Sequence, residues 1–252
     1  MAARELDRRW FSGVGYGMTE SRILDLRNFY GLLGSLAERV GGARKLAACS
    51  GRIGWPRRGV YFFMEDGEVR SDSGSGPRIV RIGTHALTTG SGTKLWSRLS
   101  QHRGQQKAGG GNHRGSIFRL IVGTAVMARN GHDVPSWGQG NNATAEVRGA
   151  EKTLECEVSQ VICAMPFLWL TIEDEPGAQS LRGYIERNAI ALLSNFEKEP
   201  LDPPSADWLG HSCNRELVRK SGLWNQNHVD EAYDPTFLDC FETLVSEMRR
   251  AA

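Results

Sequence analysis

Acidic residues are missing from a long stretch in the middle of this 252-residue chain. Between Ser73 and His132 there is no Asp or Glu, although the stretch holds nine of the chain's 31 Lys and Arg residues. All 29 acids therefore lie elsewhere, and the net charge of +2 divides into a +9 segment and a remainder of −7. Such a one-sided charge argues against an evenly charged scaffold and favours a polyanionic partner.

Long apolar runs and paired cysteines are also lacking. No apolar run approaches the ~18 residues needed to cross a bilayer, which argues against a membrane protein. The first ten positions carry charges where a secretory leader needs apolar residues, so we expect a cytoplasmic protein. The five cysteines are scattered and form no C-x-x-C pair, which argues against a disulfide framework and a zinc ribbon.

The remaining pattern is that of a mixed globular domain. Helical spacing of apolar residues predicts helices over Thr19–Val40, Thr93–Gln106, Glu146–Val161 and Ser180–Ser194, with a last helix after Asp234-Pro235. Apolar or alternating runs predict strands over Gly59–Met64, Arg78–Gly83 and Met165–Ile172, a turn at Glu65–Glu68 and a mobile basic loop over Gln105–Gly115. We expect an α/β domain of the α+β type, with a small, mainly antiparallel three-stranded sheet flanked by helices.

Four short motifs could carry chemistry, and they follow one another along the chain. Gly59-Val60-Tyr61 lies on the first strand and Arg81-Ile82-Gly83 on the second. Arg98 and His102 are four residues apart on a helix and so share one face. Glu186 stands in the apolar stretch of a later helix, where a carboxylate is costly unless it is paired or binds a cation.

In this order the motifs resemble the GIY-YIG nuclease family, over roughly residues 57–195. The resemblance implies an endonuclease that hydrolyses phosphodiester bonds in DNA with one divalent metal, Mg²⁺ or Mn²⁺, held mainly by Glu186. It implies that Tyr61 acts as the general base or orients the attacking water. Arg98 would bind the scissile phosphate, with His102 as its hydrogen-bonding or proton-transfer neighbour. Guanidinium and metal are the groups that stabilise the charge growing on a phosphodiester.

One position departs from the family pattern, because Arg81 stands where the second motif opens with Tyr. We hypothesise that Arg81 replaces the lost phenol by favouring the phenolate of Tyr61, or by holding a phosphate oxygen. The alternative is a catalytically inactive module that binds DNA on the same fold.

Ordinary structural roles remain open for the same residues. Glu186 could form a salt bridge with Arg182 or Arg187, Tyr61 could be a core aromatic and Arg98 a solvated helix base. An HNH-type site built on His102 and Asn112-His113 is a further alternative, although it requires a metal-binding hairpin.

The basic segment supplies candidates for phosphate contacts away from the cut. They are Arg103, Lys107, His113 and Arg114, which would contribute affinity but little sequence specificity. We expect the chain to divide into a helical N-terminal extension (1–55), a GIY-YIG-like nuclease domain (56–200) and a C-terminal extension packing on the core (201–252).

Overall fold

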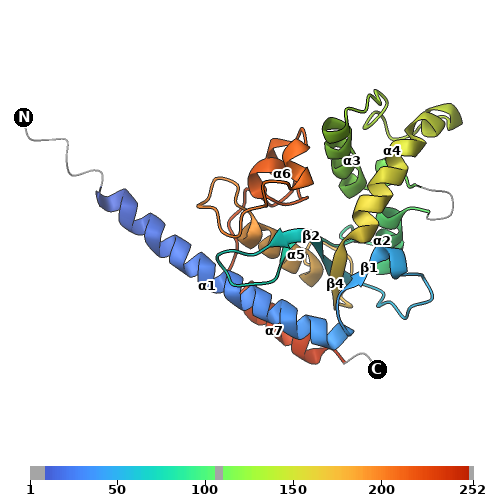
Figure 1. The fold of residues 1–252 in the computed structure, drawn as a ribbon. Coiled ribbons are helices and arrows are strands. Elements are labelled where there is room, and N and C mark those ends of the chain that lie inside the picture. The colour runs from blue at the N-terminus through green and yellow to red at the C-terminus, as the bar shows by residue number, and fades with distance from the viewer. Residues whose placement is uncertain (1–8, 106–109, 250–252) are drawn as a thin grey trace, which may run out of the picture.

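A four-stranded antiparallel sheet forms the centre of the molecule (Figure 1). The computed structural model describes residues 9–105 and 110–249. The strands are β1 (Arg44–Lys45), β2 (Gly59–Val69), β3 (Pro77–Gly83) and β4 (Pro166–Thr171), in the spatial order β1-β4-β2-β3. The predicted antiparallel pair and the third strand are confirmed, and β1 adds a short fourth strand. The predicted turn at Glu65–Glu68 is wrong, because β2 continues through it to Val69.

Helices cover both faces of this sheet. They are α1 (Arg9–Val40), α2 (Leu95–Arg103), α3 (Ile117–Asn130), α4 (Ala145–Ala164), α5 (Leu181–Leu193), α6 (Glu216–Ser221) and α7 (Phe237–Glu247), with short 3₁₀ turns η1 (Leu46–Ala48), η2 (His113–Gly115) and η3 (Leu209–Ser212). The predicted helices are present with shifted ends, and α3 and α6 are additions. In Figure 1, α1 and α7 lie side by side on one side of the sheet and α3 and α4 on the other.

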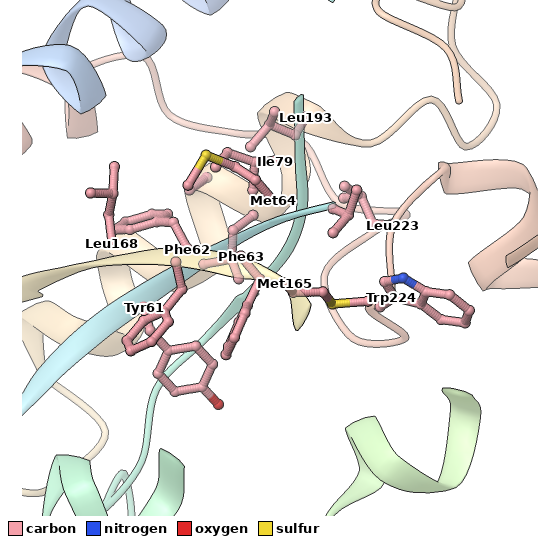
Figure 2. Close-up of a cluster of buried hydrophobic side chains, with 14 of the residues drawn as sticks. Tyr61, Phe62, Phe63, Met64, Ile79, Met165, Leu168, Leu193, Leu223 and Trp224 are labelled. Carbon is pink, nitrogen blue, oxygen red and sulfur yellow. The ribbon is translucent and has the colours of Figure 1, made fainter. Parts of the chain in front are cut away.

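Alternation along β2 divides the core into two halves, because successive side chains of a strand point to opposite faces. Phe62 packs edge-on against Phe29 of α1 and stacks on Phe241 of α7. Its neighbours Tyr61 and Phe63 face the other way, where Phe63 meets Phe118 of α3. Figure 2 shows the Tyr61 hydroxyl pointing away from the side of the sheet on which Met64 and Leu193 lie.

The outer edge of β3 is covered by a segment from much later in the chain. Trp224 donates its backbone N–H to the carbonyl of Val80 at 2.7 Å. The Asn225 side chain accepts from the backbone N–H of Ile82 and donates to its carbonyl, at 3.1 and 2.9 Å. The indoles of Trp208 and Trp224 both donate to Glu65 at 3.1 Å, and both rings are buried. This segment therefore satisfies backbone groups that an edge strand would leave unpaired.

Candidate active site

The strand register brings the two strand motifs together on one face of the sheet. Tyr61 lies opposite Gly83, and Phe63 lies opposite Arg81. Tyr61 and Arg81 are therefore diagonal neighbours on the face that α2 and α3 cover. A Cβ atom at position 83 would lie 2.4 Å from the Tyr61 hydroxyl oxygen, so only glycine leaves room for the ring.

Tyr61 contacts His102, the histidine predicted to act beside Arg98. The Tyr61 hydroxyl lies 2.8 Å from Nε2 of His102, and both side chains have no exposed surface. The other ring nitrogen of His102, Nδ1, lies 2.7 Å from the Ser116 hydroxyl. Burial, together with the charges of Arg98 and Arg81, lowers the pKa of His102 well below its ordinary value. The imidazole is therefore neutral at neutral pH.

Ser116 joins the cap of α3 to the second ring nitrogen of His102. Its hydroxyl oxygen caps α3 by accepting the backbone N–H of Arg119 at 3.3 Å. We infer that the same oxygen accepts Nδ1–H of His102, which leaves Nε2 as an acceptor for the Tyr61 hydroxyl. In that tautomer the Tyr61 hydroxyl donates to Nε2 of His102.

Glu186 reaches the same region from α5. Its Oε1 accepts the backbone N–H of Thr84 at 3.0 Å, directly after β3. Burial raises the pKa of the Glu186 carboxyl, while Arg81 and His228 lower it in part. Arg182 pairs with Asp174 instead, so the predicted alternative of an Arg182–Glu186 salt bridge is wrong.

Two arginines complete the cluster, and they differ in exposure. Arg81 is buried and donates Nη1–H to the carbonyl of Trp224, while its Nε has no hydrogen-bond partner in the described part of the chain. Burial lowers the pKa of Arg81, and the neighbouring Tyr61 and Glu186 raise it in part. Arg98 is partly exposed and donates to the Gln101 side chain and the Gly115 carbonyl, both at 3.1 Å.

The amino-acid sequence has a counterpart among known families. A family model described as a GIY-YIG domain matches residues 20–251. The chain belongs to the GIY-YIG domain family. No curated protein and no solved structure matches the chain. Since GIY-YIG domains are nuclease domains, membership supports nuclease-type chemistry and a nucleic-acid substrate.

The GIY-YIG match over residues 20–251 includes most of the predicted N-terminal extension and almost all of the predicted C-terminal extension. The division into a core and two extensions therefore stays a prediction. Among the described residues, no helix is both long and apolar enough to cross a membrane.

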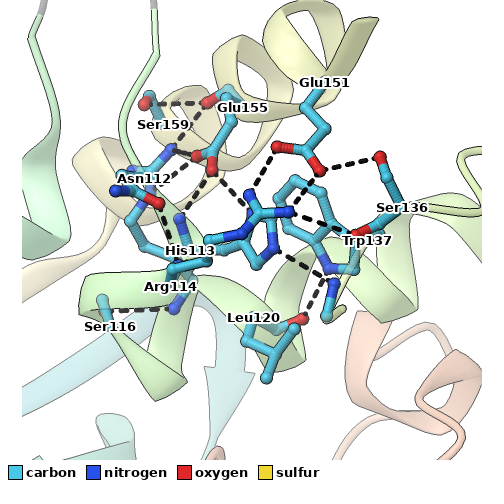
Figure 3. A network of polar contacts seen from close by, with 12 residues as sticks. Asn112, His113, Arg114, Ser116, Leu120, Ser136, Trp137, Glu151, Glu155 and Ser159 are labelled. Carbon is cyan, nitrogen blue, oxygen red and sulfur yellow. Dashed lines mark hydrogen bonds and ion pairs between the residues drawn. The ribbon is translucent and has the colours of Figure 1, made fainter. Parts of the chain in front are cut away.

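The basic segment is less available to a partner than its sequence indicates. Three of its bases form buried ion pairs with acids from outside the segment: Arg78 with Glu68, Arg114 with Glu151 and Arg119 with Glu155. Figure 3 shows Glu151 and Glu155 of α4 reaching down to residues 112–120. Burial opposes ionisation of Glu155, but His113 and Arg119 outweigh it and lower its pKa.

Two of the predicted phosphate contacts do not fit this arrangement. The Arg114 side chain is 5% exposed and is held by both carboxylate oxygens of Glu151. His113 is buried, stacks on Trp137 and uses both ring nitrogens, with Glu155 and the backbone N–H of Gly138 as partners. Both side chains hold α4 against η2, so neither is free for a phosphate. The same bonds leave His113 no free nitrogen for an HNH-type metal site.

The other predicted contacts lie near α2. Arg103 is partly exposed at the end of this helix, and its guanidinium lies 5.9 Å from the Trp96 ring centre. Lys107, like part of the predicted loop Gln105–Gly115, lies outside the described residues.

Two site residues were not found by sequence reasoning. Ser116 stands directly before the apolar helical run of α3, and recognising that run would have identified it as a cap. His85 follows Thr84 and is buried, with no hydrogen-bond partner on either ring nitrogen in the described part of the chain. Burial and the charge of Arg182 lower the pKa of His85 to about 4. No sequence pattern predicts that burial.

Proposed function

We propose that this chain is a divalent-metal-dependent endonuclease that hydrolyses phosphodiester bonds in DNA. The observation that carries the proposal is the convergence of Tyr61, Arg81, His102 and Glu186, from four separate elements, beside the partly exposed Arg98. A buried tyrosine paired with a neutral histidine, next to two arginines and a carboxylate, is a set suited to proton transfer near a phosphate.

The donor set at Glu186 fits a hard divalent cation. Oε1 of Glu186 accepts the backbone N–H of Thr84, whereas Oε2 of Glu186 has no hydrogen-bond partner among the described residues. In the same part of the chain, no group of three or more His, Cys, Asp or Glu side chains gathers as a metal cage. Mg²⁺ commonly takes one or two carboxylates and completes its shell with water and phosphate oxygens. Glu186 would hold such an ion, which stabilises charge on the phosphate when bound.

Phosphate binding and proton transfer would then be carried out by side chains of the protein. Arg98 binds the nonbridging oxygens of the phosphate, because it is the accessible guanidinium of the cluster. Tyr61 accepts a proton from the attacking water as its own proton passes to Nε2 of His102. Arg81, held against Trp224 and beside Tyr61, stabilises the phenolate during this exchange.

The alternative function is a catalytically inactive DNA-binding module. Two observations favour it: Arg81 replaces the second motif tyrosine, and the Tyr61 phenol has no exposed surface. Both functions would use the same charged face, so binding alone does not separate them.

Nicking of supercoiled plasmid in Mg²⁺ or Mn²⁺ separates the two functions. We expect the wild type to nick, and Glu186→Gln and Tyr61→Phe to reduce the rate by about 100-fold or more. Glu242→Gln, an exposed carboxylate on α7, is the matched control and should nick at the wild-type rate. Nicking that survives both site substitutions would refute the assignment, and DNA binding without nicking by the wild type would favour the inactive module.

Arg81→Ala tests the role of the departure from the family motif. We expect slower nicking than in the wild type, with the largest deficit at low pH, where the phenolate is hardest to form. Cleavage near the wild-type rate would refute a role of Arg81 in the reaction, and its hydrogen bond to the Trp224 carbonyl would then be purely structural.

A further inference from the structure

Two stacked tryptophans lie beside α2, outside the site described above. The rings of Trp55 and Trp96 have centroids 5.4 Å apart and planes inclined by 15°, and both side chains are partly exposed. Trp169 supports Trp55 edge-on from β4, with centroids 4.9 Å apart. Trp208 and Trp224, whose ring centroids lie 5.1 Å apart, are by contrast buried, and both indole N–H groups are hydrogen-bonded.

Backbone contacts join the loop that carries Trp55 to α2, the helix that carries Trp96 and Arg98. Trp55 donates its indole N–H to the carbonyl of Ser50 at 2.9 Å. The backbone N–H of Leu95, in the first turn of α2, donates to the carbonyl of Arg57 at 2.9 Å. A Cβ atom at Gly51 would lie 2.7 Å from Nε1 of Trp96, so the loop backbone lies directly against that indole.

Several basic residues lie close to the two tryptophans, some in space and some in sequence. A second acid-free stretch, residues 39–64, contains six bases and no Asp or Glu. Arg52 and Arg57 from this stretch, and Lys94 before α2, are exposed and form no ion pair in the described part of the chain. Arg44 lies 5.4 Å from the Trp169 ring centre and Arg103 lies 5.9 Å from that of Trp96. One acid contacts the backbone here: Glu173 accepts the backbone N–H of Arg57 at 2.8 Å.

We propose that this surface, formed by Trp55 and Trp96 with Arg44, Arg52, Arg57, Lys94 and Arg103, binds single-stranded DNA next to the cleavage site. Bases in a duplex are stacked on one another, whereas unpaired bases can stack on an exposed indole or on a guanidinium plane. The surrounding bases supply the phosphate contacts. The proposal rests on the proposed function, since the bound strand would continue along α2 towards Arg98. It predicts a substrate with an unpaired strand beside the cut.

Charge and aromatic exposure together favour this occupant over others. Buried packing alone would not require a surrounding group of exposed cations without ion pairs. Duplex DNA would use the cations but not the rings. An acidic protein segment is the remaining possibility, and it would bind without a preference for unpaired bases.

The test measures binding without metal, in full-length Glu186→Gln protein, with a dye-labelled single strand of about 12 nucleotides and its duplex. We expect the single strand to bind more tightly than the duplex. Arg52→Ala/Arg57→Ala should weaken single-strand binding about tenfold and lower the slope of log affinity against log salt by about 1.4. Trp96→Leu should also weaken it about tenfold, and Trp96→Phe should restore most of the loss.

Arg148→Ala/Lys152→Ala, which removes two exposed bases of α4, is the matched control and should change neither quantity by more than about twofold, since α4 contributes no residue to the proposed surface. Because Trp96 also packs on the core, the exposed double arginine variant keeps the test independent of folding. Wild-type single-strand affinity in both the arginine and the Trp96→Leu variants would overturn the proposal. Equal losses for single strand and duplex would do so too, because they would show a charge effect without stacking.

The outcome is separable from the proposed function. If Glu186→Gln abolishes plasmid nicking but the surface variants bind single strands as the wild type does, the proposed nuclease function is supported and the proposed binding surface is refuted. If the wild type does not nick plasmid but the surface variants bind single strands more weakly, the proposed binding surface is supported and the proposed nuclease function is refuted.

Discussion

Replacing Gly83 by alanine probes the packing that joins the two strand motifs. The new methyl group would stand 2.4 Å from the Tyr61 hydroxyl oxygen and 2.5 Å from Cζ, against an ordinary contact of 3.4 Å or more. The ring must therefore move by about 1 Å, although it is fully buried between β3 and His102. Overpacking of this kind costs ~1–3 kcal/mol, and loss of the Tyr61–His102 hydrogen bond adds ~1–3 kcal/mol, because it leaves buried polar groups unpaired.

We expect Gly83→Ala to lower the free energy of unfolding by about 2 to 6 kcal/mol in urea titrations, and to reduce plasmid nicking beyond the loss in folded protein. Gly34→Ala is the control, because Gly34 lies in α1 with open space around its position. That change should raise stability by about 0.5–1 kcal/mol through helix propensity. Unchanged stability and nicking in Gly83→Ala would refute the close approach of Tyr61 to β3.

Two further predictions concern buried charges. Because the pKa of His85 is lowered to about 4 from 6.5, the unfolded chain takes up a proton first as the pH falls, so stability is present above pH 6.5 and is lost between 6.5 and 4. His85→Gln should make the pH profile of urea unfolding less steep in that window, and an unchanged slope would contradict the burial of the ring. Glu155→Gln leaves the fully buried Arg119 without its counter-charge and should cost about 3–5 kcal/mol, whereas Glu157→Gln, from a partly exposed pair, should cost under ~1 kcal/mol. Equal effects of these two changes would show that the Arg119 pair is not buried.

Local patterns were sufficient to predict the central strands and to place the two strand motifs on them. The alternation in Arg78–Gly83 and the apolar run Gly59–Met64 are features of single strands, and their short separation predicted the antiparallel pair. The pairing then determines that Tyr61 and Arg81 share a face. The continuation of β2 to Val69 could not be predicted in this way, because its polar residues are stabilised by contacts with residues about 140 positions later, such as Ser205 to Glu68.

Charge was harder to predict than secondary structure. The absence of acids between residues 73 and 132 is a property of the sequence, but burial and pairing depend on α4, which brings Glu151 and Glu155 to Arg114 and Arg119. A count along the chain cannot detect a counter-charge supplied from another helix. The acid-free stretch 39–64 is likewise visible in the sequence, but only the fold shows that part of it lies beside α2, which carries Trp96.

The cover over the edge of β3 has a consequence for how this nuclease fold could be shortened. Trp224 and Asn225 use the backbone groups of Val80 and Ile82 that would otherwise face outwards. A fragment cut near Pro200 would keep every catalytic candidate but would present a bare strand to its neighbours in solution. Such an edge recruits strands from other molecules, so we expect the fragment to aggregate as it is produced. The residues that protect this edge therefore lie in a later stretch of the chain than the catalytic candidates, and removing that stretch would remove the protection.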